Sequence, residues 1–123
     1  MKQYNTDHEP LRDEWLALDE QERILLVEEY HRRRRIRVPN ATLHAVIHVI
    51  VENQLALKES VVVETITRLR NEGLNRHDAI HAIGSVLAEQ LYSALRGPHV
   101  QDQLNEQYRR ALQGLSAAKW LAG

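Results

Sequence analysis

The sequence predicts an all-α protein, a compact bundle of about five helices. Apolar residues recur at helical spacing through most of the chain, and helix-capping residues precede several of these segments. The one β-branched run that could form a strand has no second strand to pair with. A chain of 123 residues with 43% hydrophobic and 27% charged residues has the size and composition of one folded unit. We therefore expect residues 1–123 to form a single helical domain.

Composition restricts the classes of function. The chain has no cysteine, so any metal site must use histidine and carboxylate ligands. No apolar run approaches the roughly 18 residues of a membrane span, and the first residues lack the apolar stretch of a signal peptide. We therefore expect a cytoplasmic protein without a membrane partner. The net charge of −1 gives no overall attraction to nucleic acid, which makes nucleic acid an unlikely partner.

The first helix is expected over 20–34, because Asp19 followed by Glu22 is a helix-start signal. Residues 1–18 show no sustained period and are expected to form a loosely ordered N-terminal arm. The helix runs into four consecutive arginines at 32–35, which favour a capped helix end over a phosphate contact. A second copy of the chain or another protein is left open as a partner.

A central helix is expected over 41–57, where Asn40 is a good cap and the residues are apolar nearly all round. The β-branched run that follows keeps the helical period, so 60–72 is expected to be a return helix. The next helix is expected over 75–95. The return helix would then make 41–57 and 75–95 parallel neighbours. A last helix is expected over 100–121.

The most informative feature is a pair of His-x-x-x-His segments, His44 with His48 and His77 with His81. The i, i+4 spacing places two imidazoles on one face of a helix, one turn apart, where both can reach a single ion. On parallel helices the two pairs would differ in height by only about 3 Å. Imidazole is a common ligand of zinc and iron. The sequence therefore predicts a transition metal, zinc or iron first, bound by these four histidines.

Glu52 extends the central series by one more turn beyond His48. It lies about 12 Å along the helix axis from His44, so it cannot share an ion with His44. It could bind a second metal together with His48, or accept an imidazole N–H. It is also the one nearby carboxylate that could serve as a base, so whether the protein is an enzyme stays open. The alternative function is a helical interaction or scaffold module in which the histidines are structural and no metal binds.

Glu28 and His31 form a second kind of candidate, an i, i+3 pair of the type that carboxylate-bridged di-metal bundles use. Such sites need several inward carboxylates, and the chain has this spacing once, next to the basic run. The pair is better explained as the edge of an ordinary amphipathic helix.

The segment 40–95 resembles a bacterial family of small helical proteins catalogued as a domain of unknown function. The residues that carry the resemblance are Asn40, Leu43, His44, His48, Gln54, Leu55, Ala56, Arg68, Leu69, His77, Ala79 and His81. The doubled histidine pattern is its distinctive part, and the resemblance does not extend to Glu52. It implies an all-α fold and no particular activity.

Overall fold

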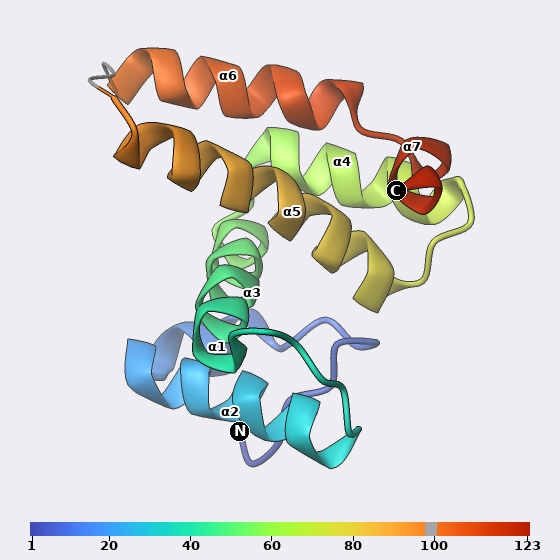
Figure 1. Ribbon diagram of the computed structural model, residues 1–123. Coiled ribbons are helices and arrows are strands. Elements are labelled where there is room, and N and C mark those ends of the chain that lie inside the picture. Colours follow the sequence, from blue (N-terminus) through green and yellow to red (C-terminus); the bar gives the residue numbers. More distant parts are fainter. Residues whose placement is uncertain (98–100) are drawn as a thin grey trace.

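The computed structural model describes residues 1–97 and 101–123, and within these ranges it contains helices and no strand (Figure 1). The all-α prediction is confirmed. The helices are α1 Arg12–Ala17, α2 Glu20–Arg33, α3 Ala41–Ala56, α4 Ser60–Asn71, α5 Arg76–Leu95, α6 Gln101–Gly114 and α7 Ala117–Ala122. The described ranges thus hold seven helices where about five were expected. None of these helices is long and apolar enough to cross a membrane.

The capping residues fix the helix starts as expected. The Asp19 carboxylate accepts from the backbone N–H of Glu22 at 2.8 Å, and the Glu22 side chain accepts from the Asp19 backbone N–H, which completes a capping box at α2. Asn40 and Asn75 cap α3 and α5 by the same kind of side-chain contact. Local sequence therefore sets where the histidine-bearing helices begin.

Two short helices account for the difference in number. α1 forms in the N-terminal segment that was expected to be loosely ordered, and the last predicted helix is divided. α6 ends at Gly114, and Ser116 caps α7 by accepting from the backbone N–H of Lys119. The predicted start at residue 100 lies outside the described residues. The helical prediction over 60–72 is confirmed by α4, which ends before Gly73 at φ +109°.

The N-terminal segment is packed into the molecule. Tyr4 and Trp15 are among the most buried side chains, and the Trp15 indole N–H donates to the amide oxygen of Asn53 in α3 at 2.9 Å. Two large aromatic residues supply enough apolar area to hold a segment that has little regular structure. The segment packs through a few anchor residues, and such packing does not require a sustained hydrophobic period in the sequence.

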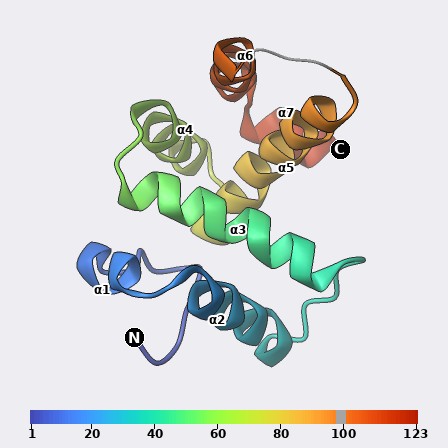
Figure 2. The same cartoon turned by 90° about the vertical axis from the view of Figure 1, so that its left-hand side faces the viewer.

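α3 is the central element (Figure 2). On one side, α3 packs with α1, α2 and the N-terminal segment around Trp15, Val27 and Val49. On the other side, α3, α4, α5, α6 and α7 enclose a larger core that includes Leu69 and Ile83. The nearly all-round apolar surface of α3 follows from its place between these two cores.

α3 and α5 are neighbours, but they cross obliquely and do not run parallel (Figures 1 and 2). This corrects the predicted parallel arrangement. Gly84 of α5 allows the close crossing, since a Cβ atom there would lie 3.2 Å from Cγ2 of Ile47 in α3. Helices that meet at such a point can cross at steep angles, because ridges of one pass through the grooves of the other. The crossing decides which histidines meet.

Candidate metal centre

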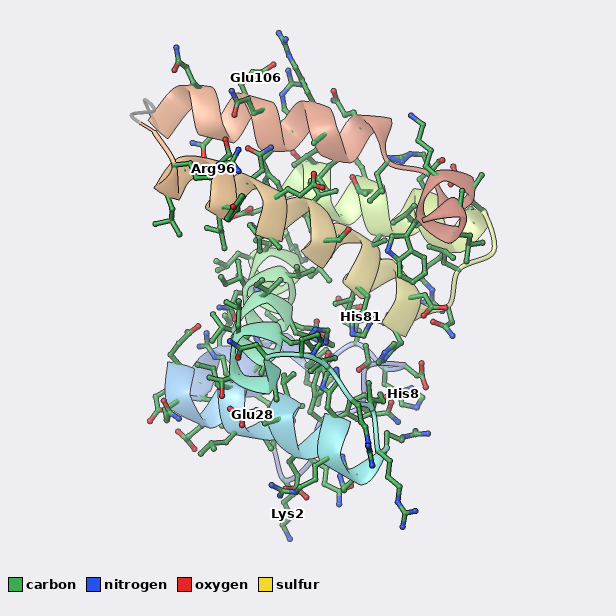
Figure 3. All side chains as sticks on the ribbon, viewed as in Figure 1. Lys2, His8, Glu28, His81, Arg96 and Glu106 are labelled. Atoms are coloured by element: carbon green, nitrogen blue, oxygen red, sulfur yellow. The ribbon has the colours of Figure 1, made fainter. Side chains whose placement is uncertain are left out.

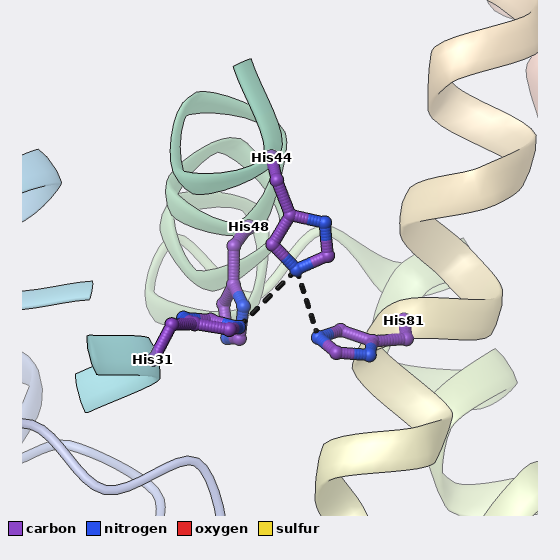
Figure 4. Close-up of side chains that lie close together, drawn as sticks. All are labelled: His31, His44, His48 and His81. Carbon is purple, nitrogen blue, oxygen red and sulfur yellow. Dashed lines mark hydrogen bonds between the residues drawn. The ribbon is translucent and has the colours of Figure 1, made fainter. Parts of the chain in front are cut away.

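Four histidines from three helices place one ring nitrogen each within 4.8 Å of one another. They are His31 of α2, His44 and His48 of α3, and His81 of α5, and we call them the His cluster (Figure 4). His31 and His48 are buried, whereas His44 and His81 are partly exposed. In Figure 3, His81 extends from α5 toward α2 and α3, away from the end of the molecule that bears Arg96.

The closest contacts in the His cluster join nitrogen to nitrogen. The Nε2 atom of His44 lies 3.2 Å from Nε2 of His31 and 3.2 Å from Nε2 of His81. Ligand nitrogens about 2.0–2.1 Å from a tetrahedral zinc ion are about 3.3 Å apart. Two of the contacts therefore already have the spacing of the edges of a zinc coordination tetrahedron.

Hydrogen bonding cannot account for both contacts. His31 donates from Nδ1 to the carbonyl oxygen of Val27 at 2.8 Å, so its neutral ring presents a lone pair at Nε2. The Nε2 atom of His44 carries either one proton or one lone pair, and can thus pair with His31 or with His81, but not with both. Neutral rings leave at least one of these 3.2 Å contacts unpaired. A cation bound by the lone pairs would make both contacts favourable.

A hydrogen-bonded chain sets the tautomer of His48. The Tyr4 hydroxyl donates its proton to Oε2 of Glu52, and it also lies 2.7 Å from Nε2 of His48. Burial, followed by the charge of Glu52, raises the pKa of Tyr4 well above its ordinary value, so the phenol keeps its proton. With that proton directed to Glu52, His48 must donate from Nε2. Its Nδ1 atom then carries a lone pair.

The Nδ1 atom of His48 is buried and has no hydrogen-bond partner among the described residues. Burying a nitrogen lone pair without a partner is unfavourable, and such a group in a folded protein calls for an explanation. Coordination of an ion would explain why this nitrogen has no hydrogen-bond partner. His48 is therefore suited to bind a metal through Nδ1, while Nε2 is held by the Tyr4 hydroxyl in the manner of an outer-shell partner.

Glu52 belongs to a separate ion pair. Its two carboxylate oxygens accept from Nη1 and Nη2 of Arg76, each at 2.8 Å, and both side chains are almost completely buried. Arg76 also donates to the carbonyl oxygen of Thr6 at 3.0 Å. This bidentate geometry is the strong form of the arginine–carboxylate contact. The Glu52 carboxylate is thus engaged by Arg76 and Tyr4 and lies outside the His cluster.

Burial lowers the pKa of three histidines of the cluster, His44, His48 and His81. It lowers the pKa of His48 well below its ordinary value, with a further contribution from His81. Burial, followed by His77 and His44, lowers the pKa of His81 to about 3. The pKa of His44 is lowered as well, first by burial and then by His31. Because a metal ligand must be an unprotonated imidazole, these shifts leave the lone pairs available at pH 7.

The structure brings together His44, His48 and His81 of the five residues proposed from sequence as ligands. Because α3 and α5 cross, His44 meets the second histidine of the α5 pair, and His77 lies beyond His81. The His77 ring packs on His81 with centroids 4.0 Å apart, but its nitrogens are not in the His cluster, and its buried Nδ1 has no described partner. Glu52 acts on His48 indirectly, because the Tyr4 hydroxyl contacts both side chains.

His31 is the residue that sequence reasoning set aside. It lies in the last turn of α2, and its Nε2 atom is 3.2 Å from Nε2 of His44. The Glu28-x-x-His31 spacing did not predict this role, since the i, i+3 partner is not in the cluster. A usable signal was a histidine on the inward face of α2, beside the buried Val27 and Tyr30. That signal identifies a core position without identifying a ligand.

No protein-family model, curated protein or solved structure matches the chain. The resemblance to a bacterial helical family therefore stays a prediction.

Proposed function

We propose that the protein binds one transition metal ion, zinc ahead of iron, through His31, His44, His48 and His81. The observation that carries the proposal is the contact of His44 Nε2 with two other Nε2 atoms, each at 3.2 Å. Neutral imidazoles cannot make both contacts favourable by hydrogen bonding, whereas a cation accepts every lone pair at once.

The donor set favours zinc. All four donors are imidazole nitrogens, which suit zinc and other borderline metals better than hard cations such as Mg²⁺ or Ca²⁺. Imidazole also suits iron, which is why iron remains the second choice. The unpartnered Nδ1 of His48 supports metal binding in general, because Tyr4 holds the far side of the ring and so fixes the direction of Nδ1.

The proposal concerns metal binding and assigns no reaction. A hydrolytic centre would need a free base beside the ion, and Glu52 is held instead by Arg76 and Tyr4. The carboxylate therefore supports the ligand geometry by orienting Tyr4 and His48.

The test is zinc binding by protein purified without a histidine tag, measured by elemental analysis after dialysis and by calorimetric titration. We expect one zinc per chain. His31→Gln should lower the affinity by more than the roughly 10–100-fold that loss of an outer-shell partner causes, because it removes a ligand outright. This variant separates the site seen in the structure from the one built on the two His-x-x-x-His pairs alone.

His8→Gln is the matched control, since His8 is exposed in the N-terminal segment. It should bind zinc like the wild type. Failure of the wild type to retain or bind zinc would reject the proposal. The histidines would then be structural, and the interaction-module function would become the better explanation.

A further inference from the structure

A cleft opens beside the His cluster, between α3 and α5. It has a volume of about 220 Å³, and three of the four cluster histidines, His44, His48 and His81, form part of its wall. The cleft exists because the two helices cross and then diverge, so their side chains do not fill the space beyond the crossing. An ion held by these histidines would face the cleft.

The remainder of the wall is mostly apolar. It includes Ile47 of α3 together with Ile80, Gly84 and Ala88 of α5. Ser85 is also at the wall, but it is exposed, and its hydroxyl donates to the carbonyl oxygen of Ala82 at 2.7 Å. The wall contains no Lys, Arg, Asp or Glu among the described residues. A molecule in this cleft would therefore find one polar end, at the histidines, and an apolar body elsewhere.

We infer that this cleft binds a small organic anion, which adds a fifth donor to the four histidines on the metal and places a short apolar tail against Ile47, Ile80 and Ala88. The inference rests on the proposed function, because the metal supplies the attraction for the donor group. Four neutral imidazoles leave the charge of a divalent ion uncompensated, and no acidic side chain lines the cleft. An anionic donor is therefore favoured over a neutral or cationic one.

The size of the cleft sets the size of the ligand. A cavity of about 150 Å³ is enough for the six heavy atoms of benzene, so about 220 Å³ accommodates a molecule of up to roughly nine heavy atoms. A carboxylate with a three-carbon tail, such as butanoate, meets this limit. A dicarboxylate of the same length does not suit the cleft, since its second charge would lie against apolar side chains without a partner.

The experiment uses the full chain loaded with Co²⁺, whose visible absorption reports changes in the coordination of the metal. Acetate, butanoate and succinate are titrated separately. We expect each to be detected through the spectrum, with butanoate binding at least about tenfold more tightly than acetate, as two additional buried CH₂ groups predict. Succinate should bind more weakly than butanoate.

Ala88→Leu fills the cleft without touching a ligand atom. This variant should load Co²⁺ normally and lose at least about tenfold in butanoate affinity, because the added side chain occupies the space of the tail. Ala118→Leu, an exposed position on α7, is the matched control and should bind butanoate like the wild type.

The outcomes are distinguishable. If Co²⁺ binds but none of the three anions changes the spectrum, the cleft is not a ligand site and the metal proposal stands. The same conclusion follows if butanoate binds no more tightly than acetate. Equal butanoate binding by Ala88→Leu and the wild type would also overturn the inference. If no Co²⁺ loads, both proposals fail together.

Discussion

Two buried polar clusters lie next to each other on α3, and they differ in whether they are complete. In the first, Glu52 and Arg76 neutralise each other through two 2.8 Å hydrogen bonds, and the Tyr4 hydroxyl donates a further hydrogen bond to the Glu52 carboxylate. In the second, the imidazoles of His31, His44 and His81 contact one another through nitrogens that hydrogen bonding cannot all satisfy.

The difference distinguishes a cluster whose hydrogen bonds are satisfied within the chain from one that leaves a contact between ring nitrogens unsatisfied. Every charge in the Glu52–Arg76 pair has its partner within the chain, so the pair needs nothing from solution. The His cluster brings one ring nitrogen from each of four histidines to within 4.8 Å of one another, and neutral rings leave at least one of its 3.2 Å contacts unpaired. Tyr4 joins the two clusters, because its hydroxyl contacts both Glu52 and His48. Glu52 and Tyr4 thereby orient His48, a member of the His cluster.

The largest effect is expected from breaking the complete cluster. Arg76→Met leaves the Glu52 carboxylate buried without its counter-charge and should lower the free energy of unfolding by about 3–5 kcal/mol in urea titrations. Arg110→Ala is the control, since Arg110 makes an exposed ion pair with Glu106 and its loss should leave the stability close to that of the wild type. The double variant Glu52→Leu, Arg76→Met should recover much of the loss, because no unpaired charge remains. Equal stability of Arg76→Met and the wild type would contradict the view that this pair is structural.

Breaking the link between the clusters should have the next largest effect. Tyr4→Phe removes the hydroxyl that holds Nε2 of His48, so the ring loses its fixed tautomer and orientation. Loss of such an outer partner should weaken zinc binding by about 10–100-fold, measured by competition with a chromophoric chelator. Tyr92→Phe, at an exposed position on α5, should leave the affinity unchanged. If both variants bind zinc like the wild type, Tyr4 does not position His48.

The His cluster should also make the metal-free protein sensitive to acid. The pKa of His81 is about 3 in the folded protein and near its ordinary 6.5 in the unfolded chain, so between these values the unfolded chain binds more protons. Stability is therefore complete above pH 6.5 and falls as the pH drops below it. Between pH 6.5 and 5 the contribution of His81 is about 2 kcal/mol.

Urea titrations in the presence of EDTA at several pH values would measure this slope. His81→Gln should make it shallower without abolishing it, because the lowered pKa values of His44 and His48 also contribute, whereas His8→Gln, at an exposed position, should leave it unchanged. A slope that is the same in all three proteins would mean that His81 is not kept neutral by its surroundings.

The smallest effect is expected at His77, which packs on His81 without joining the His cluster. His77→Gln should change the zinc dissociation constant by less than about threefold, or within about 0.7 kcal/mol. Calorimetric titration beside His31→Gln gives the comparison. A loss at His77 as large as that at His31 would restore the ligand set predicted from the two His-x-x-x-His pairs.

The sequence by itself determined most of the long helices and the starts of three of them, but not α1 or the division between α6 and α7. Asp19, Asn40 and Asn75 each cap a helix that the structure confirms, because a cap is a contact between residues three positions apart. It also indicated His44 and His48 as neighbours on one face of α3, for the same local reason. Local geometry follows from spacing along the chain, which the sequence displays directly.

Only the tertiary structure decided which histidines share a site. The angle between α3 and α5 depends on the packing of Gly84 against Ile47, and it brings His81 rather than His77 to His44. His31 joins from α2 because that helix packs on α3, a relation that no spacing along the chain encodes. Convergence of side chains depends on the angles at which helices cross, and those angles result from many side chains packing at once.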